Sequence, residues 1–112
     1  METLRQSKVA RLLQRDLGDI FIKEARHILI GAMATVTRVR VTRDLSSARV
    51  YVSIFGVNDK QSIVNKVNAH VREIRHALGT RIKNQVRVVP ELHFHLDDSL
   101  DYIDRIDDLL ND

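Results

Sequence analysis

The sequence predicts an α+β domain in which helices cover one face of a three-stranded sheet. Three observations predict it: a strict apolar–polar alternation over residues 48–55, and an apolar stripe at helical spacing on either side of it. The predicted order is helix, strand, strand, helix and strand, which makes a hairpin followed by a helical crossover to a third strand. A chain of 112 residues is long enough for one such domain with its own core and too short for two.

The first helix is expected to begin after Thr3, because Thr3 and Gln6 have the spacing of a capping box. The pattern fades near His27, and Gly31 marks the break. One apolar face of this helix is formed by Val9, Leu13, Leu17, Ile20 and Phe21.

Two β-rich runs follow, at residues 33–41 and 48–55, and a short polar connection at residues 43–46 separates them. The second run alternates strictly, which is typical of a half-buried strand. In the first run Val36 is out of phase with Val39 and Val41, so a β-bulge is expected there. We interpret the two runs as a hairpin.

The second helix is expected to start at Asn58, with Gln61 three residues further on. Its apolar stripe continues for about twenty residues, and Gly79 is the candidate C-cap. The residues of this stripe are Ile63, Val67, Val71, Ile74, Leu78 and Ile82.

The third strand is predicted from the shared parity of Val88, Leu92, Phe94 and Leu96. Pro90 has the same parity and cannot donate a hydrogen bond, which favours an edge strand. We place the domain at residues 1–98 and expect residues 99–112 to form an acidic tail with a short helix.

Composition excludes several classes of function. The chain has no cysteine, which rules out disulfides, cysteine zinc sites and thiol catalysis. No apolar stretch approaches the ~20 residues of a membrane span, and the charged N-terminal segment does not resemble a secretory signal. A cytoplasmic protein without membrane association is therefore expected. No nucleophile elbow, phosphate-binding loop or dinucleotide fingerprint is present, so catalysis is unsupported.

The formal net charge of +3 conceals a strong asymmetry. Residues 1–90 contain 17 basic and 7 acidic side chains, a net charge of +10, whereas residues 91–112 contain 1 basic and 8 acidic side chains, a net charge of −7. A basic body of this kind suggests a nucleic-acid partner.

The candidate RNA-binding residues are cations on helix stripes, on the polar faces of the strands and in the turns. A set of this size can neutralise several phosphates, although any single arginine is more often an ordinary solvated side chain. The set comprises Arg5, Lys8, Arg11, Arg15, Arg38, Arg40, Arg43, Arg49, Lys66, Arg72, Arg75, Arg81, Lys83 and Arg87.

The polar strand faces also carry Tyr51, His93 and His95. The chain has only three phenylalanines, two tyrosines and no tryptophan, so stacking of bases on the sheet is not expected, and structured RNA is the favoured target. His93 and His95 lie two residues apart, with Asp97 and Asp98 close by, as in some metal sites. No third ligand is specified by a motif, so an exposed strand face is the preferred interpretation and no metal or cofactor is expected.

Several segments resemble the ribosome-binding factor A family. They are RQSKVA at residues 5–10, TVT at residues 35–37 and VTRDLSSARVYV at residues 41–52. The most specific is RVVPELHFHLDDSL at residues 87–100, which is similar to the family signature R-x-x-P-E-L-x-F-x-x-D-x-S-L. The resemblance extends over essentially the whole chain, in order.

The resemblance implies a type II KH-like fold with the order α-β-β-α-α-β. It also implies a monomeric, non-catalytic assembly factor that binds the immature 30S subunit through 16S rRNA and assists late maturation and rRNA processing, including adaptation to cold. Ribosomal proteins are further candidate partners. The Ala-x-Gly kink of the family falls on residues 70–72, where this chain has His, Val and Arg, so a straighter central helix is expected.

Two other functions compete with this one. A protein-interaction module could use the sheet edge or the acidic tail, with its RNA contact incidental. A metal-assisted hydrolase that uses His93 and His95 is the third and weakest hypothesis.

Overall fold

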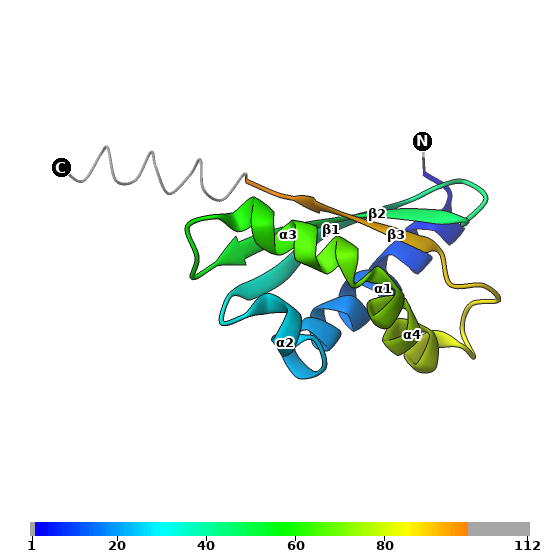
Figure 1. Ribbon diagram of the computed structural model, residues 1–112. Helices are drawn as coiled ribbons and strands as arrows, with labels where there is room; N and C mark the ends of the chain where they lie inside the picture. Colours follow the sequence, from blue (N-terminus) through cyan, green and yellow to red (C-terminus); the bar gives the residue numbers. More distant parts are fainter. Residues whose placement is uncertain (1, 99–112) are drawn as a thin grey trace.

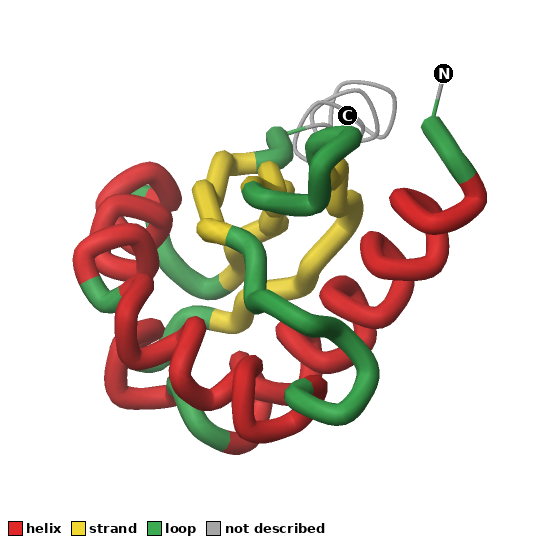
Figure 2. The backbone as a smooth tube through the Cα atoms, turned by 90° about the vertical axis from the view of Figure 1, so that its right-hand side faces the viewer, coloured by secondary structure: helices red, strands yellow, loops and turns green. Residues whose placement is uncertain are grey.

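Four helices lie on one face of a three-stranded sheet in a computed structural model that describes residues 2–98 (Figure 1). The middle strand pairs antiparallel with the first and parallel with the third, so the α+β class and the helical crossover are confirmed. In the view turned by 90°, the helices lie to the left of, below and to the right of the strands (Figure 2). In chain order the elements are α1 (Leu4–Lys23), α2 (Arg26–Leu29), β1 (Met33–Val41), β2 (Ser47–Phe55), α3 (Lys60–Ala69), α4 (Val71–Ile82) and β3 (Glu91–Leu96).

Helix α1 begins as predicted. The Gln6 amide donates to Thr3 Oγ1 at 3.1 Å, and the Thr3 amide donates to Gln6 Oε1 at 2.8 Å, which completes the capping box. Gln6 Nε2 also donates to the carbonyl of Val41 at 2.8 Å, and Gln14 Nε2 donates to the carbonyl of Val36 at 3.2 Å. These two bonds attach α1 along β1, and the five predicted apolar residues of α1 are buried against the sheet.

The predicted end of α1 near His27 is wrong. The helix ends at Lys23, where the amides of Glu24 and Ala25 both donate to the carbonyl of Ile20. A separate helix, α2, follows and is capped at its C-terminus by Ile30, which has a φ of 50° in the left-handed region. Ala25, Ile28 and Leu29 are buried in the core, so the chain turns here in order to bury a second apolar group.

The predicted bulge in β1 is confirmed. The register with β2 shifts between Val36 and Arg38, which leaves Thr37 as the extra residue. Because of this shift, Val36 and Val39 are both buried although they are out of phase in the sequence. The Thr37 hydroxyl donates to Asp97 Oδ2 at 2.6 Å, which connects the bulge to the residue after β3.

The single long central helix expected from the apolar stripe is wrong, because the chain breaks into α3 and α4 at His70. Asp59 rather than Asn58 caps the start of α3, by accepting a hydrogen bond from the Ser62 amide at 3.1 Å. Gly79 lies inside α4 rather than at its C-cap, and a Cβ added there would meet Val89 Cγ2 at 3.4 Å. The kink therefore does not need the small residues of the family pattern.

Strand β3 lies at an edge of the sheet, as Pro90 predicted. Its outer side is covered at one position by Asn68, which donates to the carbonyl of Phe94 and accepts from the Phe94 amide, both at 2.9 Å. Val88 precedes the strand and is 68% exposed, so its predicted place in the third strand is wrong. The predicted tail helix lies outside the described residues. Within residues 2–98, no helix has the length and apolar character required to cross a bilayer.

Candidate nucleic-acid interface

A groove lies between helix α1 and the loop that follows α4. It has a volume of about 450 Å³, and apolar and amide side chains line it together with cations of α1. We call the four candidate cations of α1, which recur at three- and four-residue steps, the stripe cations: Arg5, Lys8, Arg11 and Arg15. Three of these four line the groove. The groove faces solvent because the opposite side of α1 is attached to β1. We call this surface the α1 groove; it is lined by Lys8, Val9, Arg11, Leu12, Arg15, Gln85 and Val86.

A second hollow, of about 500 Å³, adjoins the α1 groove at Lys8 and extends to the β1–β2 turn. Arg5 and Arg87 also line it, so residues from both ends of the domain meet around one opening. Among the described residues, Asp44 is the only carboxylate in its lining, and it accepts hydrogen bonds from the Ser46 hydroxyl and amide and from the Thr42 hydroxyl. These bonds, chiefly the one from the Ser46 hydroxyl, hold the pKa of Asp44 below its ordinary value.

The stripe cations keep most of their charge available for a ligand. In the part of the chain that the structure describes, Arg5, Lys8 and Arg11 form no ion pair. Among these described residues, the single ion pair of Arg15 is with its neighbour Asp16, at 3.4 Å, and the Arg15 side chain is 70% exposed. An exposed pair of this kind contributes little binding energy, so the groove remains strongly positive.

Arg81 differs from the other candidates because it is engaged within the fold. Its guanidinium lies 2.6 Å from Asp19 and 2.8 Å from Glu24, at the far end of α1, and 3.9 Å from Asp16. The hydrogen bond that Arg81 donates to Asp19 is the main cause that raises the pKa of Arg81, and the same bond lowers the pKa of Asp19. Arg81 therefore joins α4 to α1, and its charge is already balanced.

The cations of α4 form a smaller surface near the same loop. Arg72, Arg75 and Lys83 line a shallow hollow of about 490 Å³ with Val89. Arg75 uses its guanidinium to hold the loop, donating to the carbonyl of Val89 at 2.7 Å and to that of Pro90 at 3.0 Å. It therefore positions the loop that forms one wall of the α1 groove. Lys66 on α3 and Arg43 in the turn are exposed outside these hollows.

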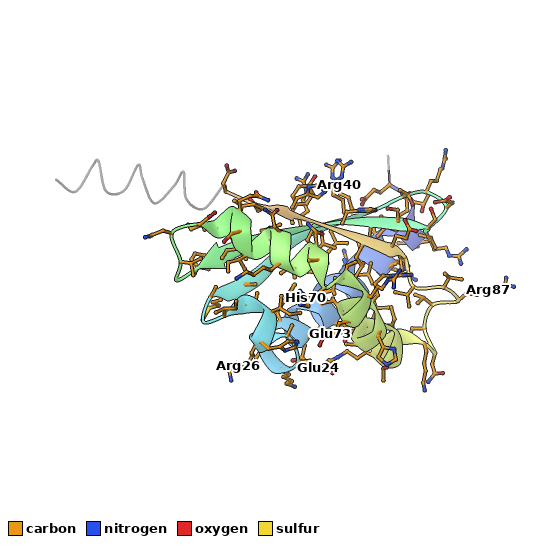
Figure 3. All side chains as sticks on the ribbon, viewed as in Figure 1. Glu24, Arg26, Arg40, His70, Glu73 and Arg87 are labelled. Carbon is orange, nitrogen blue, oxygen red and sulfur yellow. The ribbon has the colours of Figure 1, made fainter. Side chains whose placement is uncertain are left out.

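The remaining candidates lie on the face of the sheet that is turned away from the helices. Arg40 projects from this face in Figure 3, whereas Glu24 and Arg26 lie on the opposite side of the molecule. Arg38 and Arg49 alternate with buried residues of β1 and β2 and share the face with Arg40. The structure thus divides twelve of the fourteen candidates among the α1 groove with its adjoining hollow, the α4 hollow, the sheet face and the ion-pair cluster, and it leaves Arg43 and Lys66 outside them.

The metal hypothesis gains no support from the geometry. Within residues 2–98, no group of three or more histidine or acidic side chains is close enough to hold a metal ion. His93 and His95 are exposed on the sheet face. Their partners in the strand register are Arg49 and Tyr51, so neither histidine has a carboxylate or a further histidine opposite it on β2.

Comparison with known proteins identifies the family. A family model described as ribosome-binding factor A matches residues 5–110. The chain belongs to the ribosome-binding factor A family. Ribosome-binding factor A of Cytophaga hutchinsonii is 44% identical over 111 residues, which cover 99% of this chain and 84% of the relative. That of Christiangramia forsetii is 42% identical over 107 residues, 95% of this chain and 82% of the relative.

Solved structures share the fold at lower sequence identity. The crystal structure of ribosome-binding factor A from Thermus thermophilus matches with a TM-score of 0.68 and 24% identity, over 81% of this chain and 94% of that one. A homology model of the Thermus thermophilus factor, fitted into a cryo-EM map of a 30S complex, matches with a TM-score of 0.64 and 22% identity, over 88% and 97% of the two chains. The predicted KH-like fold agrees with these neighbours.

Proposed function

We propose that this protein is a non-catalytic assembly factor that binds the free 30S subunit through 16S rRNA and assists its late maturation. Family membership supports the proposal, as does the neighbour fitted into a 30S complex. The observation that carries it for this chain is the α1 groove, where the stripe cations lie exposed and almost without carboxylate partners among the described residues. Such a surface attracts phosphates without providing any catalytic group.

The geometry of the groove favours structured RNA. From Arg5 to Arg15 the stripe extends for about 15 Å, at 1.5 Å of rise per residue. A nucleic-acid strand places one phosphate about every 3.4 Å along a duplex axis, so the stripe faces about four phosphates. Because hydrogen bonds and the core hold α1 rigidly on β1, the cations keep their spacing before the RNA arrives. A rigid array of this kind reads the backbone and its shape rather than base sequence.

We further propose that the protein acts as a cytoplasmic monomer, supports rRNA processing and growth in the cold, and leaves the subunit before translation. These roles follow the family. A factor that occupies immature subunits only should sediment with free 30S particles and not with translating ribosomes. Sedimentation of the tagged protein through a sucrose gradient measures this directly, and its presence on translating ribosomes alone would contradict the proposal.

The role of the α1 groove is tested by replacing Lys8 and Arg11 with glutamine. Each lost phosphate contact lowers the slope of log affinity against log salt by about 0.7–0.9, so the double variant should lower the slope for 30S binding by about 1.5. Lys23→Gln with Arg26→Gln is the matched control, because it removes the same charge at the opposite end of α1 and on α2. An unchanged slope in the Lys8–Arg11 variant would show that the groove does not contact phosphate.

The same measurements separate the competing protein-interaction module. A module whose RNA contact is incidental would bind a single purified protein with little dependence on salt. In that case both double variants would leave the affinity for that partner unchanged.

A further inference from the structure

The sheet face turned away from the helices is not covered by any other part of residues 2–98, and it carries two rows of cationic and aromatic side chains. Cross-strand register places Arg38, Tyr51 and His95 side by side in one row. The neighbouring row consists of Arg40, Arg49 and His93. All of these side chains are exposed except Tyr51, which is half-buried, and Figure 3 shows Arg40 projecting on this side.

The planar side-chain groups of the first row lie close together. The Arg38 guanidinium carbon lies 5.0 Å from the centroid of the Tyr51 ring, within cation–π range. On the other side, the His95 ring lies 5.7 Å from Tyr51, and the two planes are inclined by 34°. Three flat groups from three strands thus form a continuous strip across the sheet.

The second row supplies positive charge next to this strip. Arg40, Arg49 and His93 line a hollow of about 480 Å³ together with His95 and the polar Thr42 and Ser47. Arg49 acts on the strip as well, because its hydrogen bond is the main cause that holds the pKa of Tyr51 below its ordinary value, with Arg38 adding to the effect. The tyrosine ring therefore lies in a strongly positive field.

Among residues 2–98, no acidic side chain offsets this field in the middle of the face, and Arg38, Arg40 and Arg49 form no ion pair. The acidic residues of the face lie at its ends, Glu91 at the start of β3 and Asp97 after its last residue. The centre is thus complementary to an anion that also presents a flat apolar surface.

We propose that this sheet face binds a short unpaired stretch of RNA, with a base stacked on Tyr51 and His95 and the adjoining phosphates on Arg40 and Arg49. Aromatic and guanidinium planes stack on any base, and a basic surface follows the backbone. The two rows are two residues apart along the strands, about 7 Å, which is enough for a base and its neighbouring phosphate. This inference rests on the proposed RNA-binding function and adds a second site, on the opposite side of β1 from the α1 groove.

The binding experiment uses hexauridylate as the probe and the full chain in a Tyr102→Phe background. Tyr51 is then the only tyrosine and the chain has no tryptophan, so its emission reports on this site alone. We expect hexauridylate to quench the Tyr51 emission as it binds. Anisotropy of fluorescein-labelled hexauridylate measures affinity in parallel, with an RNA duplex of equal phosphate number as comparison.

The variants separate stacking from charge. Tyr51→Thr removes the ring but leaves a residue that favours strands, and it should weaken hexauridylate binding about 10-fold, whereas Tyr51→Phe keeps the ring and should stay within about 2-fold. Arg40→Gln should also weaken binding, and Arg26→Gln on α2 is the charge-matched control that should not. Thermal unfolding of each variant identifies any loss of fold. The quenching measurement uses a protein in which Tyr51 is unaltered, so it tests the site even where a Tyr51 variant fails to fold.

Three results would overturn the proposal: hexauridylate that binds without altering Tyr51 emission, Tyr51→Thr with unchanged affinity, or no binding of hexauridylate at millimolar concentration. Binding of the duplex alone, with Tyr51 unaffected, would assign all RNA contact to the α1 groove. If any of these occurs while the protein still sediments with free 30S subunits, only the sheet site is refuted. Loss of 30S binding refutes the proposed function itself.

Discussion

Residues of the same type have different roles in this fold, and Arg81 and Arg11 illustrate the difference. Both are arginines on helices and both count equally in the charge of the sequence. Arg11 lines an open groove with no carboxylate partner among the described residues, whereas Arg81 lies between Asp19 and Glu24. A guanidinium that is already paired with carboxylates gains little free energy from binding a phosphate. Arg81 therefore stabilises the fold and is not expected to bind RNA.

The Arg81 cluster makes stability depend on pH in a definite direction. Because Arg81 lowers the pKa of Asp19 in the folded chain, the stabilisation is complete above the ordinary aspartate pKa of about 3.9 and is lost as the pH falls below it. We expect Asp19→Asn to lower the melting temperature at pH 7 and the difference from the unaltered protein to shrink between pH 5 and pH 3. Thermal unfolding followed by circular dichroism measures this, and a difference that stays constant over that range would contradict the role of the pair.

At the scale of elements, sequence periodicity located the helices and strands but not all of their ends. The apolar stripe of residues 63–82 continues across His70 without interruption, so the sequence pattern favours a single helix. The break occurs because α3 has to pack against β2 and β3 whereas α4 has to pack mainly against α1, and Val67 and Ile74 on either side of the break are both buried. Two helices at an angle satisfy both packing requirements, whereas one straight helix of twenty residues would leave part of its apolar face uncovered.

The residue that follows α2, Ile30, allows the cost of backbone strain at a helix end to be measured. Ile30 has a φ of 50° and its side chain is 60% exposed, so a β-branched residue takes the left-handed region while burying little surface. Because that conformation costs an L residue about 1–2 kcal/mol, Ile30→Gly should raise the free energy of unfolding by about 1 kcal/mol, or the melting temperature by about 4 °C. Ile30→Ala is the control, since it removes the side chain but keeps the Cβ. Equal effects of the two variants would exclude backbone strain as the cause.

At the scale of the whole molecule, the formal charge of +3 is an average over surfaces with separate roles. The structure places exposed cations on a groove and on the open sheet face, and it pairs others inside the fold. The acidic residues beyond position 98 lie outside the described part of the chain, yet their charge acts on any RNA within a Debye length, about 8 Å at physiological salt.

Neutralising acidic residues of the tail should therefore strengthen non-specific RNA binding. Replacing Asp104, Asp107 and Asp108 with asparagine adds three to the net charge. We expect affinity for an unrelated RNA to rise about 2- to 5-fold at about 0.05 M salt and the gain to disappear near 0.5 M, because screening removes it. Filter binding across a salt series measures both limits, and a gain that persists at high salt would indicate a contact other than charge.

The sequence by itself determined the fold class, the capping box at Thr3, the bulge in β1, the edge position of β3 and the family. Each of these depends on local pattern, which the order of residues contains. Only the tertiary structure decided that Arg81 is paired, that α2 is a separate helix, and that Arg38, Tyr51 and His95 meet on one face. The physical reason is that partners distant in the chain are chosen by packing: sparse aromatic and basic side chains become a surface only when strand register brings them side by side.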